Sequence, residues 1–151
     1  IKYAICPGVS SFCGAAAALR AEYTLPDVSQ TVIITRMAGR TPVPEKESIA
    51  ALAAHNATMV IFLSTGLLKE LSAELIRGGY KPDTPAAIVY KASWADQKVC
   101  RCTVEDLAQT ASDNGITKTA LICVGNFLGH DYSLSKLYDK SFETEFRKAE
   151  I

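Results

Sequence analysis

The stretch TVIITRMAGRTPVPEKESIAALAAHNATMVIFLS, residues 31–64, decides the fold, because it contains two apolar runs separated by a helical pattern. The first run predicts a strand over residues 30–36, and its consecutive β-branched residues are typical of a sheet covered on both faces. A helix is expected to begin at Pro44, which fits a first helical turn, and to end near Asn56. The second run, residues 57–64, predicts another buried strand. The order strand, helix, strand is that of an α/β protein.

The rest of the chain continues the alternation of helices and strands. Further helices are predicted over residues 12–23, from 68 to the Gly78–Gly79 pair and over 104–114, and further strands over 86–91, 99–102 and 119–125. Ser10 or Ser11 is expected to cap the first of these helices and Thr103 the last, while the alternating strand at 99–102 is expected to be half covered. The stretch after Gly129 is expected to pack only partly. The elements predict a single α/β domain over residues 1–151, with a five-stranded, mostly parallel or mixed sheet flanked by helices.

Composition and charge argue against several classes of function. Lys and Arg number 16, as do Asp and Glu, so the net charge is zero and no broad surface for nucleic acid is expected. No apolar run approaches the ~20 residues of a membrane helix, so no membrane contact is expected. The five cysteines lie mostly in apolar contexts and indicate a reduced, cytoplasmic protein. Cys100 and Cys102 do not have the spacing of a zinc site, and no metal is predicted.

The sequence contains no recognisable group of residues for acid–base or nucleophilic chemistry. Its glycine-rich segments match neither a P-loop nor a dinucleotide fingerprint, and no serine has the glycine spacing of a nucleophile elbow. His55 follows a helix and His130 lies in a loop, where a lone histidine is more often a cap or a surface residue. No catalytic residue is therefore predicted, and the sequence favours a reaction that depends more on positioning than on proton transfer.

Four segments carry a resemblance to a known family: PGVSSFCGAAAAL at 7–19, the stretch 29–64, GGYKPDTPAAIVYKASWADQKVCRCTVEDLA at 78–108, and ITKTALICVG at 116–125. Together they resemble the carboxyl-terminal domain of the tetrapyrrole methylases. The connection TRMAGRTPVPE, followed by VYKASW, narrows the resemblance to the precorrin-4 branch of that family. The resemblance implies S-adenosyl-L-methionine as cofactor. It also implies methyl transfer to ring carbon 11 of precorrin-4 or cobalt-precorrin-4 in cobalamin biosynthesis, without distinguishing these two substrates.

The resemblance also implies which residues meet the ligands. Small or apolar residues at strand ends let backbone N–H and C=O groups contact the adenine and ribose, as in a mostly apolar pocket. The implied cofactor contacts are Ser10, Ser11, Leu63, Ala92, Ala120 and Leu121. The carboxylates around a tetrapyrrole favour arginine, whose planar group donates two parallel hydrogen bonds. The implied substrate contacts are Arg36 and Arg40, with a further charge from Lys91 and an apolar face from Trp94.

A second domain is implied as a partner. Members of the family have an earlier domain with a GAGPGD-type loop, which this sequence does not contain, and their cofactor lies between the two domains. We therefore expect the chain to be the carboxyl-terminal half of a longer methylase and to be inactive without the missing amino-terminal domain. An interdomain face left bare would expose apolar surface and favour self-association, so a homodimer is expected.

Two other functions remain open at this point. One is a methylase of the same superfamily with another substrate, such as a different precorrin, uroporphyrinogen, diphthamide or RNA, although the neutral charge argues mildly against RNA. The other is a non-catalytic α/β module for dimerisation or ligand binding. The candidate residues also have structural explanations: core packing for the apolar ones, a helix cap for the two serines, and solvation or pairing with Glu45 or Glu47 for the two arginines.

Overall fold

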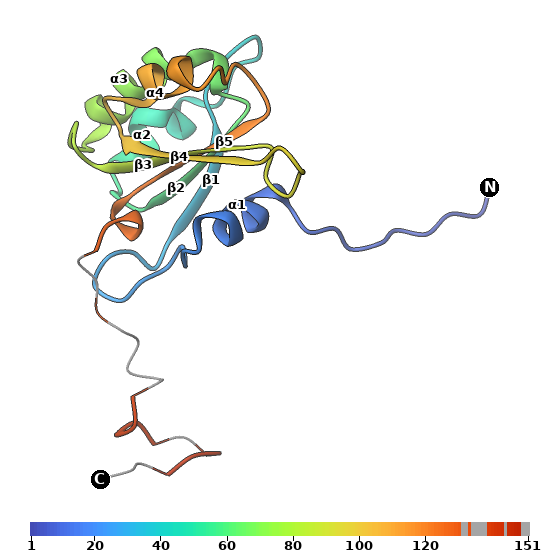
Figure 1. Ribbon diagram of the computed structural model, residues 1–151, viewed down its shortest axis with the longest axis vertical. Coiled ribbons are helices and arrows are strands. Elements are labelled where there is room, and N and C mark those ends of the chain that lie inside the picture. Colours follow the sequence, from blue (N-terminus) through green and yellow to red (C-terminus); the bar gives the residue numbers. More distant parts are fainter. Residues whose placement is uncertain (131–132, 134–138, 144, 149–151) are drawn as a thin grey trace.

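The computed structural model describes residues 1–130, 133, 139–143 and 145–148, and its centre is a five-stranded sheet with helices on both faces (Figure 1). The strands are β1 (Val32–Arg36), β2 (Thr58–Phe62), β3 (Pro85–Tyr90), β4 (Lys98–Thr103) and β5 (Ala120–Val124), in the order β1-β2-β5-β3-β4. Only the pair β1 and β2 is parallel, and the other pairs are antiparallel. The predicted α/β class is confirmed, and the sheet is mixed rather than mostly parallel.

Two separate cores lie on the two faces of the sheet. One face is covered by α2 (Ile49–Ala53), α3 (Leu68–Gly78) and α4 (Leu107–Asp113), and the other by α1 (Ser11–Leu19) (Figure 1). Successive residues of a strand point to opposite faces. On β5, for example, Ile122 belongs to the larger core under the three helices, whereas Cys123 belongs to the core under α1. Burial on both faces explains the unbroken apolar runs of the central strands.

The two edge strands differ in how well the sequence predicted them. The expectation of two covered faces holds only in part for the edge strand β1, because Val32 and Ile33 pack against the two cores on opposite faces but Ile34 is 49% exposed. The exposed Ile34 reflects strand propensity rather than burial. The half-covered strand was predicted correctly: Cys100 and Cys102 of β4 pack against the larger core, while Val99 and Arg101, which alternate with them along the strand, are exposed.

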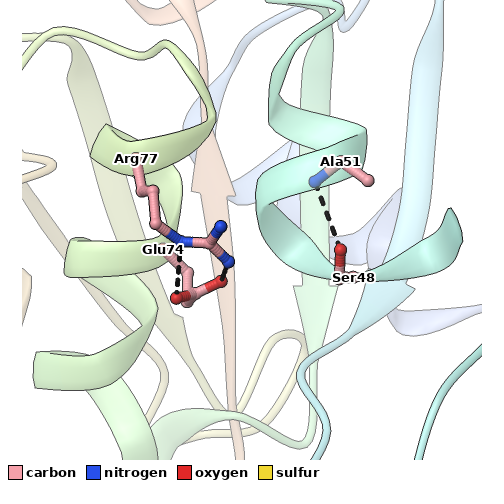
Figure 2. Close-up of polar contacts among 4 residues, drawn as sticks. All are labelled: Ser48, Ala51, Glu74 and Arg77. Atoms are coloured by element: carbon pink, nitrogen blue, oxygen red, sulfur yellow. Dashed lines mark hydrogen bonds and ion pairs between the residues drawn. The ribbon is translucent and has the colours of Figure 1, made fainter. Parts of the chain in front are cut away.

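The predicted helix from Pro44 is instead a 3-10 turn, Glu45–Glu47, followed by the short helix α2. Ser48 separates them because its backbone is extended, with φ −59° and ψ 149°. Its Oγ accepts a hydrogen bond from the N–H of Ala51 at 3.3 Å and so caps α2 (Figure 2). A continuous helix from Pro44 is therefore not formed.

Two other helix boundaries also differ from the prediction. The last helix, α4, begins at Leu107, because the Thr103 hydroxyl donates to the Asp106 carboxylate at 2.7 Å instead of accepting from a helix N–H. The first helix, α1, ends at Leu19 instead of continuing to Tyr23. Arg20 ends it with a left-handed backbone, φ 52°. Both differences arise from local backbone geometry, which apolar spacing does not report.

Helices α2 and α3 approach each other closely at Gly78. A Cβ atom on Gly78 would lie 2.5 Å from the Cβ of Ala53 and closer still to the carbonyl oxygen of Ala50. The absence of a side chain at Gly78 is thus a packing requirement of this helix pair.

The exposed surface of α3 carries an ion pair, in which the guanidinium of Arg77 pairs with the carboxylate of Glu74 (Figure 2).

The two ends of the chain lie outside the sheet. Residues 1–10 are exposed and extend away from it (Figure 1). The prediction of partial packing after Gly129 falls largely on residues outside the described set, and the described residues beyond Gly129 are exposed. No helix among the described residues has the length and apolar character needed to cross a membrane.

Candidate functional site

An open cleft lies at the edge of the sheet where β2 and β3 end and β5 begins. Strand pairing brings these ends together, because β5 runs antiparallel to both neighbours and Ala120 pairs with Tyr90. The cleft has a volume of about 210 Å³ and extends to the start of α1. Its lining residues are Ser11, Phe62, Leu63, Thr65, Val89, Lys91, Ala92, Trp94, Thr119, Ala120 and Leu121. A mostly apolar hollow with a few polar groups is the usual form of a ligand site.

Seven of the residues predicted for ligand binding line this cleft: Ser11, Leu63, Lys91, Ala92, Trp94, Ala120 and Leu121. The structure therefore brings together five predicted cofactor contacts and two predicted substrate contacts. The remaining three predicted residues, Ser10, Arg36 and Arg40, are not part of the lining.

The two serines differ in their relation to the cleft. Ser10 occupies the N-cap position of α1 with an extended backbone, but its side chain makes no hydrogen bond to the helix. Ser11 is the first residue of the helix and lines the cleft. Ser10 therefore occupies the predicted N-cap position, but its hydroxyl group does not cap the helix.

Four residues at or beside the cleft have left-handed backbone conformations: Leu63 (φ 53°), Lys91 (φ 47°), Ser93 (φ 70°) and Thr119 (φ 58°). None of them is a glycine, asparagine or aspartate, the residues that enter this region most readily. Each such residue costs about 1–2 kcal/mol of backbone strain. Strain of this kind is found disproportionately at functional sites. Sequence reasoning missed this feature because these residue types give no signal for a left-handed turn.

Lys91 is engaged within its own loop. Its Nζ pairs with the carboxylate of Asp96 and lies 5.0 Å and 5.2 Å from the ring centroids of Tyr90 and Trp94. The hydrogen bond to Asp96 raises the pKa of Lys91, and the same bond lowers the pKa of Asp96. Asp96, which the sequence analysis did not select, thus balances the charge expected to meet a substrate carboxylate. Trp94 remains 61% exposed at the cleft.

The two predicted arginines have different surroundings. The guanidinium of Arg36, the last residue of β1, donates to the carbonyl oxygens of Met37, Thr41 and Pro42. Arg40 is exposed and makes no hydrogen bond or ion pair with any residue that the structure describes. Neither arginine pairs with a carboxylate in that part of the chain, so the expected pairing with Glu45 or Glu47 is absent there.

Four lining residues were not predicted: Phe62, Thr65, Val89 and Thr119. Phe62 and Thr119 directly precede predicted residues, so the strand-end argument could have included them. Thr65 carries a more distant contact, because its hydroxyl donates to the carbonyl oxygen of Ala120 at 3.3 Å, 55 residues further along the chain. A single sequence gives no signal for that pairing.

Lys91 is the one titratable side chain among the described lining residues, so the cleft contains no pair of groups for proton transfer. Away from the cleft, burial raises the pKa of the thiols of Cys102 and Cys123 to about 11. His55 and His130 are exposed and do not line the cleft. Among the described residues, no group of three metal-ligating side chains occurs. The cleft is thus built to hold and orient a ligand.

Residues 1–108 match the family model described as Tetrapyrrole (Corrin/Porphyrin) Methylases. This match includes most of the chain. It also includes the cleft residues Leu63, directly after β2, and Ala92, shortly after β3. The chain belongs to the tetrapyrrole methylase family. The resemblance inferred from the sequence is confirmed.

Relatives of this methylase chain carry the name of the predicted branch. It is 54% identical over 150 residues to the cobalt-precorrin-4 C(11)-methyltransferase of Methanocaldococcus jannaschii, a match that covers 99% of the chain and 58% of the relative. It is 51% identical over 148 residues to the protein of the same name from Priestia megaterium, covering 95% and 57%. The chain therefore spans little more than half the length of these curated relatives.

Solved structures of methylases agree with the fold. The X-ray structure of a cobalt precorrin-4 methyltransferase has a TM-score of 0.80 at 50% identity, over 82% of this methylase chain and 52% of that one. A uroporphyrin-III C-methyl transferase from Thermus thermophilus, complexed with S-adenyl homocysteine, has a TM-score of 0.62 over 82% and 50%. Its identity is 19%, so that second likeness concerns the fold alone.

Proposed function

We propose that this chain supplies one wall of the active-site cleft of an S-adenosyl-L-methionine-dependent methyltransferase that methylates ring carbon 11 of precorrin-4 or cobalt-precorrin-4. The names of the relatives at 54% and 51% identity support this substrate class. A uroporphyrinogen-III C-methyltransferase from Bacillus subtilis is only 28% identical, so uroporphyrinogen has weaker support as the substrate. The second wall comes from an amino-terminal domain, since the chain spans little more than half of its relatives.

The observation that carries the proposal is the open apolar cleft at the sheet edge. Its volume of about 210 Å³ lies below the ~300–1,000 Å³ of complete ligand pockets. A hollow of this size accommodates part of an adenosyl group and leaves the rest for a facing domain. Leu63 and Leu121 offer apolar contact for a flat ring, and the left-handed turns at Leu63 and Lys91 end the strands abruptly beside it.

The two ligands have different neighbours in this proposal. The residues assigned to the cofactor are Ser11, Leu63, Ala92, Ala120 and Leu121, with Ser10 directly before them. The exposed ring of Trp94 is assigned to the apolar face of the macrocycle. Lys91 keeps its partner Asp96 and orients Trp94 through the contact between its ammonium group and the ring. The loop that contains Arg40 is assigned to the substrate carboxylates.

Methyl transfer fits a cleft without an acid–base pair. When bound, the cofactor would supply an electrophilic methyl group for the ring carbon and leave as a neutral thioether, and the methylated ring would release one proton to balance the charge. Much of the acceleration can come from aligning the reacting atoms. The residues of this chain therefore act by holding and orienting both ligands, and no catalytic residue is assigned to this half.

The test is to combine this chain with the part of the Methanocaldococcus jannaschii relative that it does not cover. We expect calorimetry to show binding of S-adenosylhomocysteine by the pair and not by the chain alone. We also expect mass spectrometry and carbon NMR with a labelled methyl group to show one methyl added at carbon 11 of precorrin-4 or cobalt-precorrin-4. A pair that binds no cofactor would contradict the proposal. Methylation of uroporphyrinogen in place of precorrin-4 would contradict the substrate and keep the methyltransferase.

A further inference from the structure

The loop over residues 37–42, directly after β1, is held from one side by the guanidinium of Arg36. Nη2 of Arg36 donates to the carbonyl oxygen of Pro42 at 2.8 Å, and Nη1 donates to those of Thr41 and Met37 at 3.2 Å and 3.3 Å. Hydrogen bonds from a charged donor are stronger than neutral ones. A single side chain thereby fixes both ends of the loop, and three of its N–H donors are already used on the backbone.

Ser64 holds the start of the same loop from a second side. Its Oγ accepts a hydrogen bond from the N–H of Met37 at 3.0 Å and donates one to the carbonyl oxygen of Phe62 at 2.7 Å. Ser64 is fully buried, so these bonds are shielded from water. Because Phe62 and Leu63 line the cleft, this serine ties the loop to the edge of the sheet where the ligands are proposed to bind.

Arg40 occupies the tip of this braced loop. The N–H of Gly39 donates to the carbonyl oxygen of Thr41 at 3.3 Å, which closes a tight turn around Arg40. The side chain of Arg40 is exposed and unpaired within the described part of the chain. The two arginines of the loop are therefore in opposite situations, since one is bound to the backbone and the other is available.

We propose that Arg40 binds a carboxylate of the substrate and that Arg36 is a positioning residue that acts through Arg40. This inference rests on the proposed function, because it takes the carboxylates of the tetrapyrrole as the ligand. A planar guanidinium forms two parallel hydrogen bonds with a carboxylate. A loop backbone that is already fixed loses less freedom on binding. The sequence suggested one role for both arginines, and their contacts divide that role.

The kinetic test uses the methylase assembled with its amino-terminal domain. Arg40→Ala is expected to raise KM for the tetrapyrrole at least about tenfold, the loss of one charge-assisted contact, without changing the affinity for S-adenosylhomocysteine. Arg36→Ala and Ser64→Ala are expected to raise the same KM by a smaller factor. Neither should add to the effect of Arg40→Ala in a double variant, because both act through Arg40. Additive effects of Arg36→Ala and Arg40→Ala would overturn the inference, since Arg36 would then meet the substrate itself.

Hydrogen exchange tests the brace without any substrate. Amides of residues 37–41 should exchange faster in Arg36→Ala and in Ser64→Ala, and at the wild-type rate in Arg40→Ala. Arg77→Ala, at an exposed arginine of α3, is the matched control and should leave both the exchange of the loop and KM unchanged. Unchanged exchange in Arg36→Ala would overturn the positioning role. Failure of the proposed function would give a different result: the wild-type assembly would methylate no tetrapyrrole, while the differences in exchange would persist. The proposed role of Arg40 in substrate binding would then also be wrong.

Discussion

The backbone N–H of Lys91 donates to the carbonyl oxygen of Thr119 at 2.9 Å, and both residues have left-handed backbones, with φ of 47° and 58°. This bond joins the end of β3 to the start of β5 at the cleft. A β-branched residue such as threonine is an outlier in that region of backbone space. Strained conformations persist only where the surrounding structure determines them. The conformation of Thr119 is therefore imposed by strand pairing.

We expect Thr119→Asn to raise the free energy of unfolding by about 0.5–1 kcal/mol, because asparagine adopts left-handed conformations more readily. The threonine side chain is exposed, so little packing is lost. Urea unfolding of the chain measures the difference. Thr117→Asn is the control, because Thr117 is also exposed but does not have a left-handed backbone. An equal gain in both variants would show that asparagine stabilises this segment for another reason.

The central strands could be predicted from the sequence because a strand that is buried on both faces is a run of consecutive apolar residues. Strand β2 lies within the predicted run at 57–64, and β5 lies within 119–125. The position of β1 could not be predicted in this way, since an edge is defined by strand order. Ile34 has the side chain of a buried strand and is nevertheless half exposed. Strand order depends on pairing between segments far apart in the chain.

The site was predictable to a similar degree. The family resemblance pointed to seven of the lining residues, including Leu63 and Ala120 at strand ends, for which the residues alone favoured core packing. The contacts that modify their roles depend on loop conformation. Asp96 neutralises Lys91 only because the loop between β3 and β4 folds back, and Arg36 meets carbonyl groups only because residues 37–42 curl around it. The types of the residues alone do not determine these loop conformations.

Gly78→Ala is expected to destabilise the chain by about 2 kcal/mol or more, because the added methyl group would overlap the backbone of Ala50 and the side chain of Ala53. Both obstacles are close to the helix backbone, so neither can move without shifting α2. Chemical denaturation measures the loss. Gly66→Ala is the matched control, since a Cβ there meets nothing within 4 Å, and it should change stability by less than about 0.5 kcal/mol. A similar loss of stability in both variants would show that replacing a glycine, and not the overlap with α2, causes the effect.

Cys123 is expected to make stability depend on pH in alkaline solution. Burial raises the pKa of its thiol from 9.0 to about 11. Between these values the folded state keeps the proton and the unfolded state releases it. The free energy of unfolding is therefore greatest below pH ~9 and falls as the pH rises towards ~11.

The contribution of Cys123 to that slope is at most about 1.4 kcal/mol per pH unit. Urea unfolding at several pH values between ~8 and ~10 should show a smaller slope for Cys123→Ala than for the wild type. The slope should not vanish, because burial also raises the pKa of Cys102 to about 11. Equal slopes in the two proteins would contradict the assignment to Cys123, whatever the change in their mean stability.

Leu63 is expected to oppose folding and to favour ligand binding. It is 85% exposed with a φ of 53°, so Leu63→Asn should raise the free energy of unfolding by about 0.5–1 kcal/mol. The same change removes an apolar side chain from the cleft, and the assembled methylase should bind S-adenosylhomocysteine about tenfold more weakly. Arg20→Asn is the matched control, because Arg20 has a φ of 52° at the far end of α1 from the cleft. That variant should gain stability with unchanged ligand affinity. Wild-type affinity in Leu63→Asn would mean that this side of the cleft is not part of the cofactor site.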